Sequence, residues 1–126
     1  MKWANEQRFV MVQIEDKEAV GCMEEIVAVD HIDVFFIGPA DLSQSYGVPG
    51  QFDHPLIKEA TEKLAALCKK HNRHWGIPCS PETAPELIAK GARFLAAGAD
   101  VIAIAEYMKS MRRGFEAAGL TFQAEF

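Results

Sequence analysis

The chain has 126 residues, the length of a single domain that can bury a core of its own. With 49% hydrophobic and 25% charged residues, its composition is that of a soluble globular protein, and its formal net charge is −5. This acidic balance, without any basic run, argues against a nucleic acid partner. No segment approaches the ~18 consecutive apolar residues of a membrane span, so we expect no membrane association.

The three cysteines, Cys22, Cys68 and Cys79, are widely spaced and form no CxxC motif. Cys22 and Cys68 stand among apolar residues at helical spacing, where a cysteine usually behaves as a small buried hydrophobic residue. We therefore expect free thiols rather than disulfides, which fits a reducing compartment. Because the amino terminus lacks the pattern of a signal peptide, the sequence predicts a cytoplasmic protein.

Apolar runs predict four strands along the chain, over residues 9–14, 34–37, 74–79 and 93–97. Asp16 is placed to cap a helix after the first strand, and apolar residues then recur at helical spacing as far as Val27. The second strand shows no alternation of polar and apolar residues, as expected of a strand that is covered on both faces.

The segment that follows Ser43 is rich in turn-forming residues over 46–52 and predicts a loop. Pro55 suits the first position of a helix, and a buried stripe then continues to Cys68. This pattern predicts a long helix between the second and third strands.

The remaining helices are predicted from their ends. Ser80 as a cap and Pro81 at the first helical position open a helix that stops at Gly91. Asp100 opens a last helix, which Gly119 closes. One face of this last helix is apolar and consists of Val101, Ile104, Met108, Met111 and Phe115.

Strands that alternate with helices predict an α/β fold with a parallel sheet and right-handed crossovers. Four such βα units form either a small open sheet or half of an eight-stranded (β/α)₈ TIM barrel, whose usual length is ~250 residues. Length alone leaves both possibilities open. Because no linker or low-complexity tract interrupts the chain, we expect residues 1–126 to form a single domain.

Two carboxylates follow the first two predicted strands, Glu15 and Asp41. The carboxyl ends of parallel strands form the edge at which α/β folds bind their ligands. Two carboxylates at that edge can serve as oxygen ligands of a hard divalent ion, or as a general acid–base pair. The ordinary alternative is that Asp41 caps a helix and Glu15 is a solvated loop charge.

The segment Gly38-Pro39-Ala40 carries no bulky side chain. An anionic ligand could therefore approach the backbone N–H groups of Ala40 and Asp41 at a helix start, with help from the Ser43 hydroxyl. Pro39 has no N–H to offer. The ordinary alternative for Ser43 is a turn or cap residue.

The four histidines form no metal-binding pattern, and we expect surface positions for His31, His54, His71 and His74. The sequence also contains no GxSxG, GxGxxG or P-loop motif. The strand-end carboxylates are therefore the principal candidates for chemistry.

The segments VQIE at Val12–Glu15 and FIGPADLS at Phe36–Ser43 resemble the HpcH/HpaI aldolase family. Its members include 4-hydroxy-2-oxoheptanedioate aldolase and 2-dehydro-3-deoxyglucarate aldolase. The run Gly91–Asp100 is similar to the last barrel strand of that family and the start of the following helix. The resemblance extends from about Phe9 to Gly119, and it implies a TIM barrel of which this chain corresponds to strands five to eight.

The resemblance implies a class II aldolase, a lyase that reversibly cleaves a 2-keto acid into pyruvate and an aldehyde with a divalent metal such as Mg²⁺, Mn²⁺ or Co²⁺. By this resemblance, Glu15 and Asp41 correspond to the two protein ligands of the metal. Gly38, Ala40, Asp41 and, as a lesser candidate, Ser43 correspond to the segment that seats the pyruvate carboxylate. The metal would stabilise the enolate as a Lewis acid.

The family's enolate-stabilising arginine and its proton-transfer histidine belong to the first half of the barrel, and we find no substitute among the arginines of this chain. The sequence therefore predicts either an aldolase represented by its carboxyl-terminal half or a catalytically incomplete half-barrel that only binds a divalent metal or a small keto acid. A third hypothesis is an unrelated α/β binding module. Because a half-barrel exposes inner strands and unpaired edges, we expect a homo-oligomer in which two four-strand halves meet.

Overall fold

The computed structural model describes residues 2–122, and the chain divides into two compact units between Ala96 and Ala97. Each unit is described by itself below, and the prediction of a single domain over residues 1–126 stays a prediction. Among the described residues no helix is both long and apolar enough to span a membrane.

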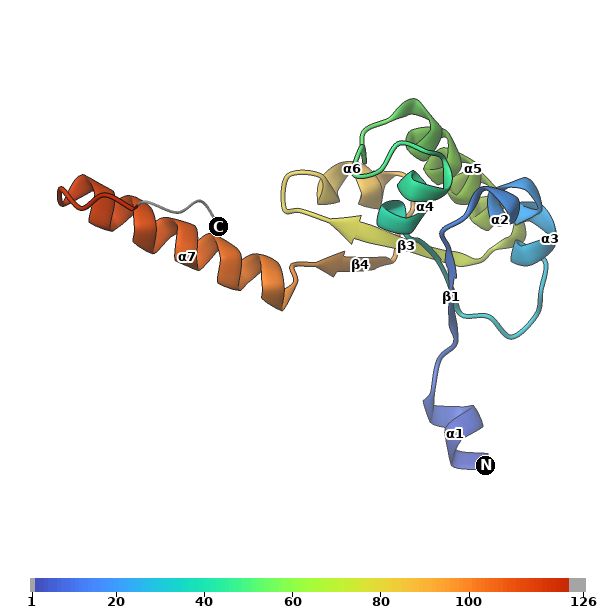
Figure 1. The fold of residues 1–126 in the computed structure, drawn as a ribbon. Helices are drawn as coiled ribbons and strands as arrows, with labels where there is room; N and C mark the ends of the chain where they lie inside the picture. The colour runs from blue at the N-terminus through green and yellow to red at the C-terminus, as the bar shows by residue number, and fades with distance from the viewer. Residues whose placement is uncertain (1, 123–126) are drawn as a thin grey trace. The chain divides into compact units, whose positions relative to one another are not determined.

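The first unit contains one sheet, a short helix that precedes it and the helices that follow its strands (Figure 1). Its strands are β1 (Met11–Ile14), β2 (Val34–Ile37), β3 (His74–Cys79) and β4 (Phe94–Ala97), the last of which reaches the division between the units. Its helices are α1 (Lys2–Gln7), α2 (Lys17–Gly21), α3 (Met23–Val27), α4 (Pro39–Ser45), α5 (Pro55–His71) and α6 (Ala84–Ala89). The strand order is β1-β2-β3-β4, and β2 pairs in parallel with both of its neighbours. The predicted parallel α/β fold is confirmed.

The core lies between one face of the sheet and the helices. Phe35, Ile37 and Trp75 point into it and are at most 1% exposed. From α5, Ala60 and Leu64 pack against them, as the predicted buried stripe requires. Side chains at alternate strand positions share one face of a sheet, so this core uses every second residue of β2 and β3.

The other face of the sheet carries an aromatic cluster of Phe9, Phe36 and Phe94. The rings of Phe36 and Phe94 meet edge to face with centroids 6.0 Å apart, and those of Phe9 and Phe94 are 6.1 Å apart. Phe9 precedes β1 whereas Phe94 belongs to β4, at the opposite end of the strand order. The sheet is therefore curled, with this cluster on its concave face.

Gly76 on β3 lies beneath the aromatic cluster. A Cβ atom at this position would press against the carbonyl oxygen and side chain of Phe94 and would lie 2.9 Å from the Phe36 ring. The absence of a side chain at Gly76 therefore lets the two rings close over the sheet.

Two predictions about the first helical segment are wrong. The helix predicted after Asp16 is split into α2 and α3 at Cys22, although Asp16 does cap α2 by accepting a hydrogen bond of 2.6 Å from the Ala19 N–H. Cys22 is exposed rather than buried, because it lies in the break between the two helices. Cys68 is buried as expected, and Cys22, Cys68 and Cys79 are all free.

The loop predicted over residues 46–52 is confirmed, and it follows the short helix α4 over residues 39–45. One further boundary differs from the predictions. Helix α6 begins at Ala84 rather than at Pro81, because Ser80 and Thr83 close a turn in which the Ser80 N–H donates to Thr83 Oγ1 at 3.0 Å. Pro85, and not Pro81, occupies the first helical turn.

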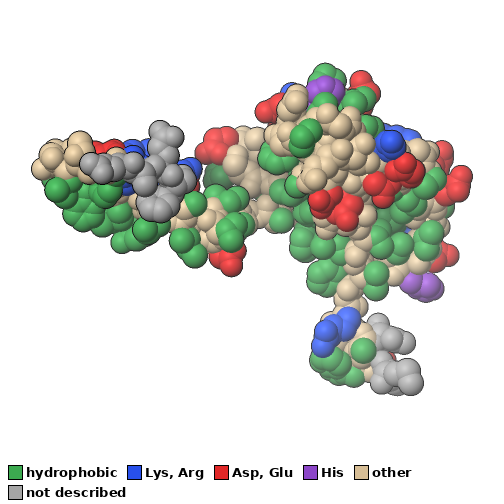
Figure 2. Space-filling view, viewed as in Figure 1, with side chains coloured by type: hydrophobic (Ala, Val, Ile, Leu, Met, Phe, Trp, Pro, Cys, Tyr) green, Lys and Arg blue, Asp and Glu red, His purple; other side chains and the backbone are tan. Residues whose placement is uncertain are grey.

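The second unit is dominated by α7 (Asp100–Ala117), which begins at Asp100 as predicted and ends before Gly119. Gly119 has a φ of 90°, the left-handed conformation that favours glycine after a helix. The predicted apolar face of α7 is exposed along its length, and Figure 2 shows these hydrophobic side chains gathered along the helix.

Replacement of Gly76 by alanine tests the close approach on the concave face. We expect Gly76→Ala to lower the free energy of unfolding by about 1–3 kcal/mol, because backbone atoms of β4 must shift to admit the methyl group. Urea denaturation measures this loss. The control Gly21→Ala has open space around its Cβ and is expected to leave stability unchanged or slightly raised, so equal losses in both variants would contradict the packing.

Thiol reactivity tests the different placement of two cysteines. Burial raises the pKa of Cys68 to about 11, so its thiol stays protonated at neutral pH, whereas Cys22 is exposed. At pH 8 we expect a maleimide or aromatic disulfide reagent to modify Cys22 more than tenfold faster than Cys68. Mass spectrometry of the labelled protein reads out both sites, and equal rates in the folded state would contradict the burial of Cys68.

Candidate metal site at the carboxyl ends of the strands

The ends of β1 and β2 lie level with each other. Ile14 is opposite Ile37 in the parallel register, and these are the last residues of their strands. The Gly38 N–H then donates to the Ile14 carbonyl at 3.0 Å, which extends the pairing by one residue. Glu15 and Gly38 consequently lie at the same edge of the sheet, the carboxyl-end edge that binds ligands in parallel α/β folds.

The Glu15 carboxylate lies over the backbone of Gly38. A Cβ atom at Gly38 would be 2.9 Å from Glu15 Oε2 and 2.5 Å from Gln13 Nε2. Gln13 Nε2 in turn donates a hydrogen bond of 2.6 Å to Glu15 Oε2. The carboxylate is therefore held in place by the Gln13 amide, and it fits there because residue 38 has no side chain. Glu15 is half-buried, unlike a freely solvated loop charge.

Asp41 is presented to solvent in the first turn of α4, immediately after the end of β2. A carboxylate at this position interacts favourably with the helix dipole, which agrees with the ordinary explanation of the residue. In the described part of the chain, however, its side chain makes no hydrogen bond or ion pair. The carboxylate is thus accessible and available to a ligand.

Ser43 has a structural role, which agrees with its ordinary explanation as a turn or cap residue. It is fully buried, its hydroxyl donates to the Ala40 carbonyl at 2.7 Å, and it accepts a hydrogen bond of 3.0 Å from the Gly50 N–H. These two bonds tie the following loop to α4. A contact between Ser43 and a substrate stays a prediction.

The end of β3 adds polar groups to this edge that the sequence analysis did not select. Ser80 follows β3 directly, and its side chain stabilises the charged form of Glu82 and so lowers the pKa of that carboxyl. The signal in the sequence was the same as for Glu15, namely polar residues directly after an apolar strand.

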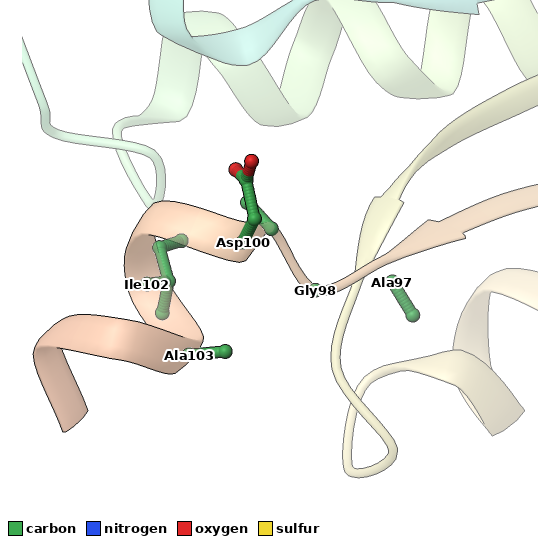
Figure 3. A pocket seen from close by; sticks show the side chains of 6 residues that line it. Ala97, Gly98, Asp100, Ile102 and Ala103 are labelled. Atoms are coloured by element: carbon green, nitrogen blue, oxygen red, sulfur yellow. The ribbon is translucent and has the colours of Figure 1, made fainter. Parts of the chain in front are cut away.

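In the second unit, a hollow opens at the start of α7 (Figure 3). It is lined mainly by small side chains, and Asp100 is its one charged residue. Asp100 Oδ1 accepts a hydrogen bond of 2.7 Å from the Val101 N–H, so this carboxylate is engaged at the helix start. The run of alanine and glycine over residues 96–99 was the signal for this hollow in the sequence.

The donor set of the Glu15–Asp41 edge suits a hard divalent ion, since carboxylate oxygens are the ligands that Mg²⁺ and Mn²⁺ prefer. Over residues 2–122 no group of three or more His, Cys, Asp or Glu side chains is arranged to hold a metal ion. An ion bound by Glu15 and Asp41 would therefore take its remaining ligands from water, backbone or substrate oxygens.

The three arginines of the first unit lie away from this edge. Arg8, Arg73 and Arg93 precede β1, β3 and β4, so they belong to the amino-terminal ends of the strands. The other two, Arg112 and Arg113, are on α7. Among the histidines, His54 is engaged at the start of α5, where its Nδ1 accepts a hydrogen bond of 3.3 Å from the Leu56 N–H.

Residues 1–106 match the family model described as HpcH/HpaI aldolase/citrate lyase. The chain is 38% identical over 120 residues to the pyruvate aldolase of Rhizobium etli and 37% identical over 123 residues to a 4-hydroxy-2-oxo-heptane-1,7-dioate aldolase of Salmonella arizonae. It covers 44% of each of these proteins, which cover 94% and 97% of this chain, so it spans about half the length of the curated relatives it matches.

A solved structure of a family member likewise matches this chain over about half of its own length. The HpcH/HpaI aldolase from Desulfitobacterium hafniense superposes with a TM-score of 0.81 at 27% identity, over 99% of this chain and 48% of that aldolase. The fold of the described residues is thus that of about half of a family member.

Replacement of Ser43 by alanine tests whether its two hydrogen bonds stabilise the fold. We expect Ser43→Ala to lower the free energy of unfolding by about 1–2 kcal/mol, because the Gly50 N–H and the Ala40 carbonyl lose their partner. Gln44→Ala, an exposed change on the same helix, is expected to stay within about 0.5 kcal/mol of the parent. Urea denaturation of both variants measures the difference, and an unchanged Ser43→Ala variant would contradict the account.

Proposed function

The chain belongs to the HpcH/HpaI aldolase/citrate lyase family, and we propose that it carries the metal- and pyruvate-binding half of the active site of a carbon–carbon lyase. The proposed reaction is the reversible cleavage of a 2-keto acid into pyruvate and an aldehyde. The names of the relatives from Rhizobium etli and Salmonella arizonae support this class of reaction.

The observation that carries the proposal is the placement of the Glu15 carboxylate on the bare backbone of Gly38, at the end of the strand that neighbours β2. Asp41 comes four residues after Ile37, the last residue of β2, and its exposed side chain is free to turn toward a ligand. We propose that Glu15 and Asp41 hold a divalent ion such as Mg²⁺ or Mn²⁺. A bound ion would supply Lewis-acid stabilisation of the negative charge that develops on the keto oxygen.

The backbone at the start of α4 supports a role in seating the carboxylate of the keto acid. The first N–H groups of a helix have no acceptor within the helix. The Gly38 N–H is used by Ile14, and Pro39 has none, so the donors that remain are those of Ala40 and Asp41. The absence of a side chain at Gly38 supports access of a small anion to these two groups.

A second candidate function is binding of the metal and keto acid without turnover. The observation that favours it is the position of the arginines, since in the described residues none follows the carboxyl end of a strand. An arginine at that edge could stabilise an enolate, and without it the chain would bind pyruvate but exchange its methyl protons slowly.

Titration calorimetry tests the proposed site. We expect pyruvate to bind measurably only in the presence of Mn²⁺, and Glu15→Gln or Asp41→Asn to weaken this joint binding at least tenfold, because each variant removes one charged oxygen ligand. The matched controls are Glu18→Gln and Asp53→Asn, which neutralise exposed carboxylates on α2 and in the loop before α5 and should bind like the parent.

Joint binding that survives in both site variants would contradict the assignment of Glu15 and Asp41. Exchange of the pyruvate methyl protons with deuterated solvent separates the two candidate functions. Exchange catalysed by the chain supports the lyase, whereas binding without exchange supports the second candidate.

A further inference from the structure

The sheet ends in an open edge on β1. The Val34 N–H donates to the Val10 carbonyl and the Gly38 N–H to the Ile14 carbonyl, so Val10 and Ile14 direct their backbone groups toward β2. Because backbone groups alternate in direction along a strand, Met11 and Gln13 direct theirs to the opposite side. Within the described residues no strand lies there.

The other end of the sheet, at β4, is open in the same way. The Arg93 N–H donates to the Trp75 carbonyl at 2.9 Å, so residue 93 faces β3. By the same alternation, Phe94 and Ala96 direct their backbone groups away from β3, to a side without a neighbouring strand in the described chain. Each edge is therefore a four-residue strand that offers two backbone N–H donors and their carbonyls.

Neither edge strand carries the charged side chains or proline that often keep edge strands from pairing. Such strands are usually protected by charged side chains, proline or a bulge. Met11–Ile14 contains one polar and three apolar residues, and Phe94–Ala97 is entirely apolar; neither includes a charged residue or proline. The edges match in length and carry no like charges that would oppose contact between copies.

The concave face of the sheet carries only part of the interior side-chain layer that a closed barrel has. In a closed eight-stranded parallel barrel, each interior layer consists of four side chains from alternate strands. Phe36 and Phe94 meet on alternate strands, β2 and β4, above Gly76, and so form two members of such a layer. The contact between Phe94 and Phe9 shows that the sheet is already curled.

We propose that a second copy of this chain closes the sheet, with β1 of each copy paired in parallel to β4 of the other. A two-fold axis along the barrel keeps all eight strands in one direction and creates two identical seams. The second copy would also supply the two missing members of the aromatic layer. That this chain covers 48% of the Desulfitobacterium hafniense aldolase at a TM-score of 0.81 agrees with two copies making one barrel.

Closure of the barrel by a second copy would also change the surroundings of the candidate site. The proposal of closure itself does not rest on the proposed function. Parallel pairing would bring the carboxyl end of the second copy's β4 beside the carboxyl end of β1, which carries Glu15. One wall of the candidate site would then come from the partner copy.

The oligomeric state and the hydrogen exchange of the unmodified chain together test the proposal directly. Sedimentation velocity at micromolar concentration should show a dimer of twice 14.0 kDa. In that dimer, NMR-detected exchange should find the amides of Met11, Gln13, Phe94 and Ala96 as protected as those of Val12 and Ile14. A monomer, an open-ended ladder of oligomers, or a dimer in which these four amides exchange freely would each overturn it.

A proline substitution provides an independent test. Met11→Pro removes one donor at the open edge and leaves the hydrogen bonds to β2 in place, at the start of a strand where proline is tolerated. We expect at least a tenfold weaker dimer, whereas the control Met11→Leu keeps the N–H and should dimerise like the parent. Circular dichroism confirms that both variants fold. A folded Met11→Pro variant that dimerises normally would overturn the proposed seam and point to the exposed apolar face of α7 instead.

Discussion

The in-register parallel pairing of β1 with β2 is the constraint on which the candidate site depends. The pairing of Ile14 with Ile37 sets Glu15 beside Gly38, and a shift of one residue would turn the Glu15 side chain to the other face of the sheet. The register is fixed by burial, since Ile14, Phe35 and Ile37 all fill the same core. The position of the carboxylate is therefore a consequence of hydrophobic packing several residues away.

The two carboxylates at this edge differ in how firmly they are held. The Gln13 amide and the Gly38 backbone position Glu15, whereas Asp41 is exposed and free to adjust. A site with one fixed and one adjustable ligand suits an ion that completes its coordination with water or substrate oxygens. Ser43 contributes indirectly, because its hydrogen bonds hold the loop that follows α4.

The strands were predictable from the sequence because burial on both faces leaves continuous apolar runs, of which Val34–Ile37 is the clearest. The start of α5 was predictable because Pro55 favours the first helical position. The break at Cys22 was not, since the apolar spacing continues across a one-residue interruption. The start of α6 was misplaced at Pro81, because only the turn between Ser80 and Thr83 delays the helix to Ala84, where Pro85 lies in the first turn.

For the site, the sequence indicated which strand ends carry Glu15 and Asp41, but not how they are held. The contact between Glu15 and Gly38 depends on a neighbouring strand 23 residues away, and the buried role of Ser43 depends on a loop that returns to it at Gly50. Such long-range contacts leave no local pattern. The exposure of the α7 face was equally hidden, because the spacing of its apolar residues is that of any amphipathic helix.

The central claim is that Glu15, Gly38 and the start of α4 form one divalent ion site. Paramagnetic broadening by Mn²⁺ in amide NMR spectra tests it most directly. At substoichiometric Mn²⁺, the account predicts that the amide signals of Glu15, Gly38 and Ala40 broaden first, before those of the exposed acidic residues Glu24 and Glu25 on α3. Equal broadening at α3, or none near Gly38, would contradict it.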